Sequence, residues 1–221
     1  MITEQKLNNY EVKAIEKPPK PFFGGLEVLL FYSMACYVFL IITNVLISYF
    51  FGFSLATNYI SDLGSRRIIP FPYFHDIICV FGGLISLPAN FFVRKKLRIR
   101  YKDSKHSLLF VELGVALGLV GNVAYVLLGV FSLDRAGPGQ IFHGIIALLS
   151  FTGYITSIFF FSLNIVLSHK CRLKNLGAFG LVIPVFLSVL YLAISIPLVE
   201  WALLSSIVLF MLILDYYVFK K

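Results

Sequence analysis

Charged residues are scarce in this chain of 221 residues. Asp, Glu, Lys and Arg make up 14% of the sequence, whereas hydrophobic residues make up 59%. A soluble domain of this length exposes too much surface to be covered by so few charges, so that class is excluded. The apolar residues also arrive in long blocks, which predicts membrane spans. We therefore expect an integral membrane protein.

Cysteine is scarce too, and the spacings of common catalytic motifs are missing. Cys36 and Cys79 lie inside apolar blocks and Cys171 lies in a basic segment, which provides neither a disulfide framework nor a set of metal ligands. No H-x-x-H, H-E-x-x-H or G-x-S-x-G pattern occurs. We predict no cofactor and no bound metal, and a metal hydrolase remains only as an alternative.

Six apolar blocks, each near the length of about 20 residues that crosses the hydrocarbon core, predict an all-α bundle of six transmembrane helices. They run over residues 26–53, 74–93, 107–131, 140–167, 176–197 and 201–219. We expect residues 1–24 to form a polar cytoplasmic tail without a cleavable signal peptide. Residues 25–221 are expected to form a single transmembrane domain.

Basic residues are distributed unevenly between the segments that connect the blocks. Sixteen of the 19 Lys and Arg residues fall on the side of the N-terminus, and the opposite loops keep only Arg66, Arg67 and Arg135. Cytoplasmic loops carry such an excess of basic residues, so we predict that both termini are cytoplasmic. The formal net charge of +8 is therefore explained by the basic residues of the predicted cytoplasmic segments, and no nucleic-acid partner is expected.

Polar residues gather at the predicted outer face. The candidate binding residues are Asn58, Ser61, Asp62, Arg66, Arg67, His75, Asp76, Asp134, Arg135 and His143. His75, Asp76 and His143 fall at or just inside the hydrocarbon, where ionisable groups usually pair or line a wet cavity. We predict that the set forms one outward-opening pocket. The alternative is a set of loop caps and ion pairs: Asp62 would cap a short helix, and Asp134 would pair with Arg135 or Arg66.

Three functions are compatible with such a pocket. In the first, the three outer arginines attract the phosphate of a lipid headgroup, Asp62 and Asp134 accept hydrogen bonds from its hydroxyls, and His143 moves a proton. In the second, a lipid hydrolase or transferase uses His143 as its base, aided by Asp62 or Asp134. In the third, a small-solute or proton-coupled transporter connects Glu112 and Asn122 to the outer cluster through a continuous wet path.

The third block carries three glycines on one helix face. Gly114 and Gly118 are four residues apart, and Gly121 follows three residues later. Small residues on one face let transmembrane helices approach closely. The face is compatible with a homo-oligomer contact and with packing inside the bundle, which is the commoner use of such glycines.

Several short stretches resemble a known family. The stretch "NYISDLGS" follows the first block, the second block ends in "ANFFVRKK", and "GLVGNVAYVLLGVFSLDRAGPGQIFHGIIALLSFTGYITSIF" follows later. The first is similar to the P-x-I-S-D/E-x-G signature of the DRAM/Frag/Sfk-like membrane proteins and their prokaryotic relatives of unknown function. The matching positions are Ile60, Ser61, Asp62 and Gly64, then His143 and Gly144. Asn58 departs from the pattern, because the family often has proline there.

The resemblance covers about residues 26–170 and implies the same six-span topology. Eukaryotic members are linked to remodelling of glycosylphosphatidylinositol anchors, to plasma-membrane phosphoinositides and to lysosomal or autophagic membranes, so the shared theme is lipid. We therefore expect a multi-pass protein whose partners are membrane lipids and which binds lipid headgroups or assists lipid remodelling.

Overall fold

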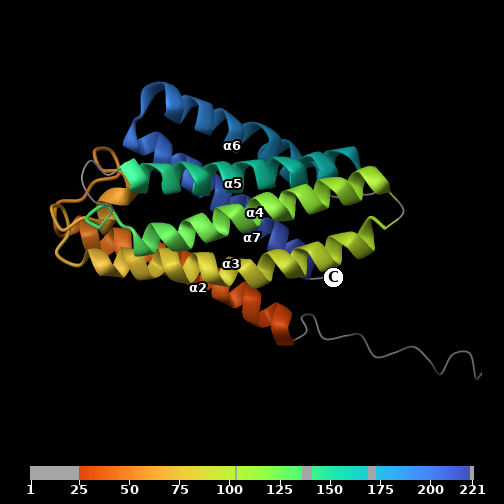
Figure 1. The fold of residues 1–221 in the computed structure, drawn as a ribbon, viewed down its shortest axis with the longest axis horizontal. Coiled ribbons are helices and arrows are strands. Elements are labelled where there is room, and N and C mark those ends of the chain that lie inside the picture. The colour runs from red at the N-terminus through yellow and green to blue at the C-terminus, as the bar shows by residue number, and fades with distance from the viewer. Residues whose placement is uncertain (1–24, 103, 136–140, 169–172, 220–221) are drawn as a thin grey trace, which may run out of the picture.

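The computed structural model describes residues 25–102, 104–135, 141–168 and 173–219, and all of its long elements are helices (Figure 1). They are α2 (Gly25–Tyr49), α3 (Pro72–Arg100), α4 (Lys105–Val130), α5 (Ile141–Leu167), α6 (Lys174–Ile194) and α7 (Pro197–Phe219), with a short 3-10 helix, η2 (Ile60–Gly64), after α2. All six long helices have the length and apolar composition of membrane spans. The predicted all-α fold of six spanning helices is therefore confirmed, whereas the orientation of the termini stays a prediction.

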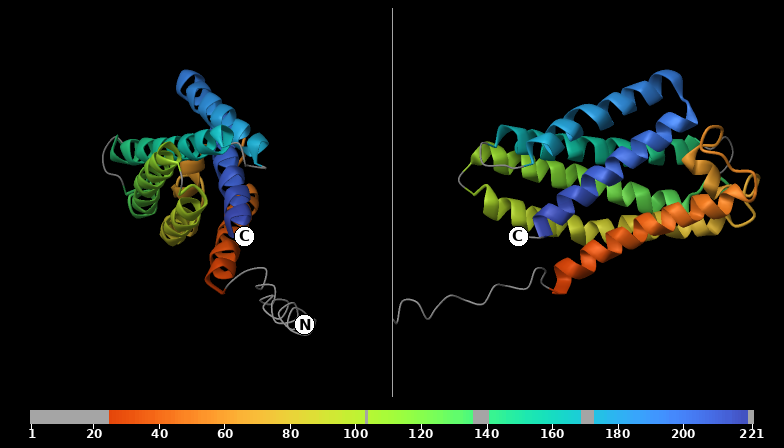
Figure 2. Two further views of the ribbon diagram at one scale, coloured as in Figure 1. Left: turned by 90° about the vertical axis from the view of Figure 1, so that its right-hand side faces the viewer. Right: turned by 180° about the vertical axis from the view of Figure 1, so that it is seen from behind.

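The helices run up and down, so that α2 begins and α7 ends at the same end of the bundle (Figure 1). We call the opposite end, which carries residues 50–71 and 131–135, the outer end, following the prediction from the charge distribution. Helix α7 contacts α2, α3, α5 and α6, and crosses the bundle obliquely (Figure 2). Helix α6 leans away from α5 towards the outer end (Figures 1 and 2).

The C-terminal ends of α2 and α3 differ from those of the apolar blocks. Helix α2 stops at Tyr49, before the end of its block, because the chain turns at Gly52 with a φ of +85°. That turn folds Phe53 back into the protein, where it is 1% exposed and packs edge-on against Trp201. Helix α3 continues through Arg100, seven residues beyond its block, and three of its basic side chains there pair with carboxylates of neighbouring helices.

Ion pairs join the helices at this inner end. Arg94 Nε and Nη2 both lie 2.7 Å from Glu112 Oε2, and Arg98 lies 3.4 Å from the other oxygen of the same carboxylate. Lys96 Nζ lies 2.7 Å from Glu27 Oε1 and so ties α3 to α2. A long basic side chain can lay its stem along the helix while its charge reaches a partner, so the charged residues do not end the helix.

The turn between α6 and α7 is very short. Ser195 adopts the left-handed conformation with a φ of 46°, and its N–H donates to Tyr191 O at 2.8 Å. Pro197 then begins α7 instead of closing the preceding block, so the predicted bounds of blocks five and six are wrong by several residues. The physical reason is that proline lacks an N–H, which the first turn of a helix does not need.

The glycines of α4 lie inside the bundle, against α5. A methyl group added at Gly114 would meet the Phe161 ring at 2.8 Å, and one added at Gly121 would meet Tyr154 N at 3.0 Å. The three glycines therefore serve packing inside the bundle, which was one of the two uses compatible with their sequence spacing. Oligomer formation itself stays a prediction, but this face is already covered by α5 of the same chain and would have to be freed first.

Candidate functional site

Three of the hollows lined by the described residues reach the outer half of the bundle. The outer recess, about 440 Å³, is bounded by Gly64, Arg66, Arg67, Asp76, Asp134 and Arg135, with Pro72, Tyr73 and Ser132. The interior cavity, about 90 Å³, is lined among others by Ser61, His75, Cys79, Ser86, His143 and Glu200. The lateral groove, about 460 Å³, lies along α5 and α6 and is lined among others by Ser61, His143, Gly144, Leu148, Tyr191, Leu192 and Glu200.

Hydrogen bonds within the loops hold the outer recess together. Asp134 accepts from Arg66 N at 2.6 Å and from the Ser65 hydroxyl at 3.1 Å, which joins the loop after η2 to the loop after α4. Arg135 Nη2 lies 2.6 Å from Asp76 Oδ2 and donates to Gly129 O at 2.8 Å. The guanidinium therefore satisfies a carboxylate and a free carbonyl at the end of α4 at once.

The other two arginines of the recess are exposed. Arg66 places its guanidinium 5.0 Å from the centre of the Tyr73 ring, and Arg135 approaches the same ring at 5.5 Å. Arg67 donates its backbone N–H to Ser65 Oγ at 3.3 Å. Positive charge at the mouth of the recess is thus carried mainly by Arg66 and Arg67, because the charge of Arg135 is paired with Asp76.

Residues 58–62 are fastened to the turn between α6 and α7. Trp201 Nε1 donates to Asn58 O at 3.0 Å, and Tyr59 OH donates to Ser195 O at 2.5 Å. Ile60 N donates to Glu200 Oε2 at 2.8 Å. Three bonds between segments far apart in the sequence fix η2 across the outer end, and they hold Ser61 over the hollows beneath it.

The carboxylate of Asp62 accepts hydrogen bonds from residues of its own loop. Its Oδ2 accepts from Tyr59 N at 2.9 Å and from Asn58 Nδ2 at 3.4 Å. Asn58 Oδ1 in turn accepts from Ser54 N at 3.0 Å. These bonds cap the 3-10 turn, and the alternative reading of the sequence also predicted that Asp62 caps a short helix. The observed donors, however, come before Asp62 in the sequence and not after it. Asp62 lines none of the three hollows.

The two histidines face the interior cavity from opposite helices. His143, 9% exposed, has its Nδ1 at 3.0 Å from Phe131 O, an acceptor, which assigns the proton to Nδ1 and leaves Nε2 a free lone pair. His75 has its Nδ1 at 3.3 Å from the Asn44 amide nitrogen and its Nε2 at 3.5 Å from Cys79 Sγ. The amide donor assigns the proton of His75 to Nε2.

A pair of phenols forms the far wall of the interior cavity. Tyr37 OH donates to Tyr125 OH at 2.7 Å, and both rings line the cavity together with Tyr154. The composition alone gave no reason to single out these tyrosines, because aromatic residues near span ends are the expected interfacial belt. Their meeting inside the bundle is a property of the fold.

Ser61, His143 and Glu200 line both the interior cavity and the lateral groove. Within the described part of the chain, neither the Ser61 hydroxyl nor His143 Nε2 has a hydrogen-bond partner. Glu200 is 7% exposed and holds Ile60 N with Oε2. The place where the two hollows meet therefore carries a hydroxyl and an imidazole lone pair that are available to a ligand, beside a carboxyl group that already interacts with Ile60 N and Tyr191.

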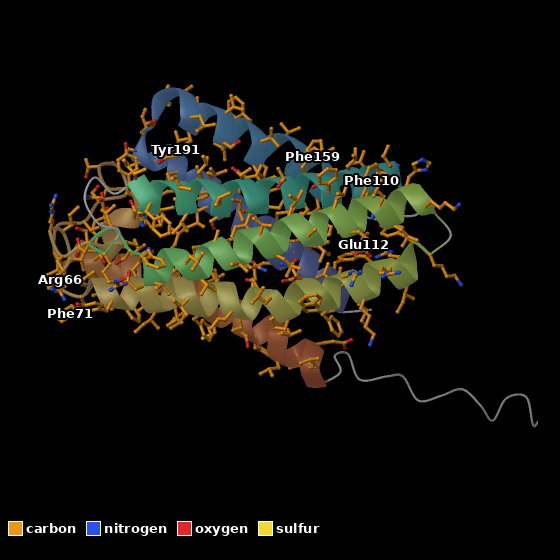
Figure 3. The ribbon with its side chains drawn as sticks, viewed as in Figure 1. Arg66, Phe71, Phe110, Glu112, Phe159 and Tyr191 are labelled. Atoms are coloured by element: carbon orange, nitrogen blue, oxygen red, sulfur yellow. The ribbon has the colours of Figure 1, made fainter. Side chains whose placement is uncertain are left out.

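The ten predicted residues accordingly fall into three groups. The outer recess receives Arg66, Arg67, Asp76, Asp134 and Arg135, the interior cavity receives Ser61, His75 and His143, and neither receives Asn58 or Asp62. Gly64 and Ser132 line both spaces and form the partition between them. Figure 3 shows Arg66 and Tyr191 at the same end of the bundle but on different sides of it.

Glu200 is a site residue that was not among those predicted from the sequence. A carboxylate in the first turn of an apolar span, with no basic residue beside it in the sequence, is the signal that points to it. Its role depends on η2 folding across the start of α7, which the sequence does not reveal.

Glu112 and Asn122, the two residues that the transport alternative requires, lie away from the polar residues of the outer end. Glu112 is held by Arg94 and Arg98 near the inner end, as Figure 3 shows for its position, and lines none of the three hollows. Asn122 is fully buried between helices. Among the residues described, no three His, Cys, Asp or Glu side chains lie close enough together to hold a metal ion.

Fold and composition together define the class: a multi-pass integral membrane protein with six spanning helices. Comparisons with protein-family models, with curated proteins and with solved structures found no match. Similarity to the DRAM/Frag/Sfk-like proteins consequently stays a prediction that rests on its short motifs.

Proposed function

We propose that this protein binds a single membrane lipid from the side, with the polar head of the lipid at Ser61, His143 and Glu200 and its tail in the lateral groove. The observation that carries the proposal is the meeting of an interior cavity with a groove that faces the bilayer. The rim of the groove includes Leu148 and Leu192, which are 56% and 70% exposed on spanning helices and therefore face lipid.

The chemistry of the groove favours a particular kind of head. Its polar lining consists of hydroxyls, one imidazole, one phenol and one carboxyl group, and no Lys or Arg among the described residues belongs to it. Glu200 and the lone pair of His143 both accept hydrogen bonds. A head that donates, such as a hydroxyl or an ammonium group, is therefore better matched than a bare phosphate. Phosphate recognition by Arg66 and Arg67 would take place in the outer recess, beyond the partition.

The resemblance to DRAM/Frag/Sfk-like proteins supports the lipid theme of this proposal, since its matching residues include Ser61 and His143. The same resemblance includes Asp62 and Gly64, whose roles here are local. Asp62 caps η2, and a methyl group on Gly64 would lie 3.2 Å from Asp76 Oδ1, so glycine lets the turn approach α3.

The proposal is tested by filling the lateral groove with a bulky side chain. Gly144 lines it, and a Cβ at that position meets nothing within 4 Å, so Gly144→Phe should place a ring in the groove without disturbing the fold. Ile145→Phe is the matched control, because Ile145 is a neighbouring exposed residue on α5 outside the groove. Full-length protein is purified in mild detergent, and bound lipid is measured by native mass spectrometry.

We expect one lipid per wild-type chain, at least a five-fold loss in Gly144→Phe and no loss in Ile145→Phe. A wild-type protein that carries no lipid, or equal retention by both variants, would refute the proposal.

A second function is favoured by one observation: Ser61 and His143 line the same two hollows, and neither the Ser61 hydroxyl nor His143 Nε2 has a hydrogen-bond partner in the described segments. We propose as an alternative that the bound lipid is hydrolysed. Nε2 of His143 takes a proton from water, the water oxygen adds to the ester carbonyl, and the proton passes to the departing alcohol as the fatty acid is released. Asp62 and Asp134, which the sequence analysis paired with His143, are occupied by loop hydrogen bonds.

Binding and hydrolysis are distinguished by His143→Ala. Hydrolysis predicts that release of fatty acid from added lipid is lost while bound lipid remains detectable, whereas binding alone predicts no release in wild type either. His106→Ala is the control, because His106 is an exposed histidine at the opposite end of the bundle. Equal turnover in wild type and His143→Ala would exclude His143 as the base.

A further inference from the structure

The basic residues of the outer end all line one hollow. Arg66, Arg67 and Arg135 are the only Lys or Arg residues that the sequence places on the predicted outer side, and all three border the outer recess. Membrane topology favours few basic residues on this side, so it does not explain why those present surround a single space. Figure 3 shows Arg66 among the loops at this end.

Most hydrogen-bond donors of these three side chains are available. The guanidinium groups of Arg66 and Arg67 take part in none of the ion pairs or hydrogen bonds found between described residues. Arg135 uses Nε and Nη2 for two backbone carbonyls and Asp76, which leaves Nη1 without a described partner. Each guanidinium is a planar fork whose N–H groups match two oxygens of a phosphate.

Tyr73 brings two of the guanidinium groups to one wall of the recess. The central carbon of Arg66 lies 5.0 Å from the centre of the Tyr73 ring, and that of Arg135 lies 5.5 Å from it. Both distances are within the range of a cation–π contact. The ring comes from the first turn of α3 and itself lines the recess. Two cations from different loops are thus held near one another, which strengthens the attraction of the recess for an anion.

The two carboxylates that line the recess are already engaged by donors. Asp134 accepts from the Ser65 hydroxyl and from Arg66 N, and Asp76 Oδ2 accepts from Arg135. The other oxygen of Asp76 is fully covered. Three positive and two negative side chains line the recess, so its lining carries one net positive charge. An anion therefore meets available donors on the arginines and carboxylates whose charge is already compensated.

We propose that the outer recess binds the phosphate group of a phosphate ester, held by the guanidinium groups of Arg66 and Arg67 together with Nη1 of Arg135. The volume of about 440 Å³ leaves room for the esterified group beside the phosphate. Two sources provide this chemistry, the headgroup of an outer-leaflet phospholipid and a soluble phosphate ester. The proposal does not depend on the proposed lipid function, because the outer recess and the lateral groove share no lining residue.

The test is a calorimetric titration of the purified full-length protein, in a neutral detergent, with glycerol 3-phosphate. Glycerol is titrated in parallel as the uncharged probe. We expect saturable binding of glycerol 3-phosphate by the wild type and none of glycerol. Arg66→Gln and Arg67→Gln should each weaken the binding about five-fold, and the double variant should weaken it further. Both residues are exposed, so these variants should fold as the wild type does.

Two controls separate the recess from general effects of charge and from the lateral groove. Arg98→Gln removes the same charge from a side chain that is 53% exposed at the inner end, and it should bind the probe as the wild type does. Gly144→Phe, which fills the lateral groove, should also leave probe binding unchanged. Failure of the lipid proposal is thereby distinguishable from failure of this one. Absence of binding by the wild type, or equal affinity in the double variant and in Arg98→Gln, would overturn the proposal.

A competition experiment identifies the source of the phosphate. Phosphatidic acid is added to the detergent micelles before the titration with glycerol 3-phosphate, and diacylglycerol is the matched lipid without a phosphate. Weaker probe binding with phosphatidic acid but not with diacylglycerol supports a phospholipid headgroup as the ligand. Unchanged probe binding with both supports a soluble phosphate ester. Equal weakening by the two lipids would show that the phosphate is not what the recess recognises, and would overturn the proposal.

Discussion

The close approach of α4 and α5 provides a sensitive test of the packing of this protein. At the crossing of α4 and α5, a methyl group on Gly153 would lie 2.6 Å from Gly121 N, 2.7 Å from Gly121 Cα and 2.9 Å from Leu117 O. All three are backbone atoms, so no side chain can rotate away to make room. Ordinary contact begins at 3.4 Å, which means that Gly153→Ala has to move one helix by about 0.8 Å, the difference between 3.4 and 2.6 Å.

The cost can be estimated from this displacement. Overpacking a well-packed interior costs about 1–3 kcal/mol, and a clash with rigid backbone belongs at the upper end, near 3 kcal/mol. Replacing glycine by alanine within a helix returns about 1 kcal/mol. We therefore expect Gly153→Ala to lower the free energy of unfolding by about 2 kcal/mol, which for a chain of this size lowers the unfolding midpoint by about 4–8 °C.

Gly144→Ala is the matched comparison on the same helix. A Cβ there meets nothing within 4 Å, so only the gain in helix propensity remains, and the midpoint should rise by about 2–4 °C. Both variants are measured by thermal unfolding of the purified protein in the same detergent. If the two variants shifted the midpoint in the same direction, the backbone contact between α4 and α5 would not be as the structure has it.

Three further predictions concern the outer end. Trp201→Phe keeps the ring stacked on the core but removes the N–H that donates to Asn58 O, so the unfolding free energy should fall by about 1–3 kcal/mol; an unchanged midpoint would contradict that bond. Asp134→Ala should cost only about 1 kcal/mol because the residue is exposed, yet it should speed proteolysis of the loop after η2, and equal cleavage would argue against the loop contact. In a background without native cysteines, a membrane-impermeant maleimide applied to intact cells should label Arg67→Cys and leave Lys105→Cys unlabelled, and the reverse pattern would invert the predicted topology.

The number and type of spanning helices could be predicted from the sequence, because hydropathy alone decides which segments cross a membrane. The helix ends could not. The apolar block that starts α2 runs past Tyr49, and only the left-handed turn at Gly52 ends the helix. Helix α3 extends into charged sequence because its basic residues find Glu27 and Glu112 on neighbouring helices. The second effect depends on contacts between segments distant in the chain, and the turn at Gly52 is accompanied by such a contact, between Phe53 and Trp201.

The site was predicted less completely than the fold, and the reason is visible in two adjacent residues. Ser61 and Asp62 are adjacent polar residues of the same turn. In the structure Asp62 accepts from Tyr59 N, whereas Ser61 lines two of the hollows and its hydroxyl has no hydrogen-bond partner among the described residues. A list of polar residues cannot distinguish a side chain whose hydrogen bonds are used by its own loop from one that remains available.

The same distinction explains why the expected single pocket is divided. Residues that follow one another in a loop, such as Ser65 and Arg66, share one acceptor, Asp134, and form a wall that faces water. Residues placed by different helices, His143 on α5 and Glu200 on α7, meet on the side where α6 leans away from α5. The arginine-bearing wall and the site at His143 and Glu200 therefore open on different sides of the bundle. Under the proposed function, a ligand reaches the second site through the lipid, so its tail rather than its charge would decide whether it enters.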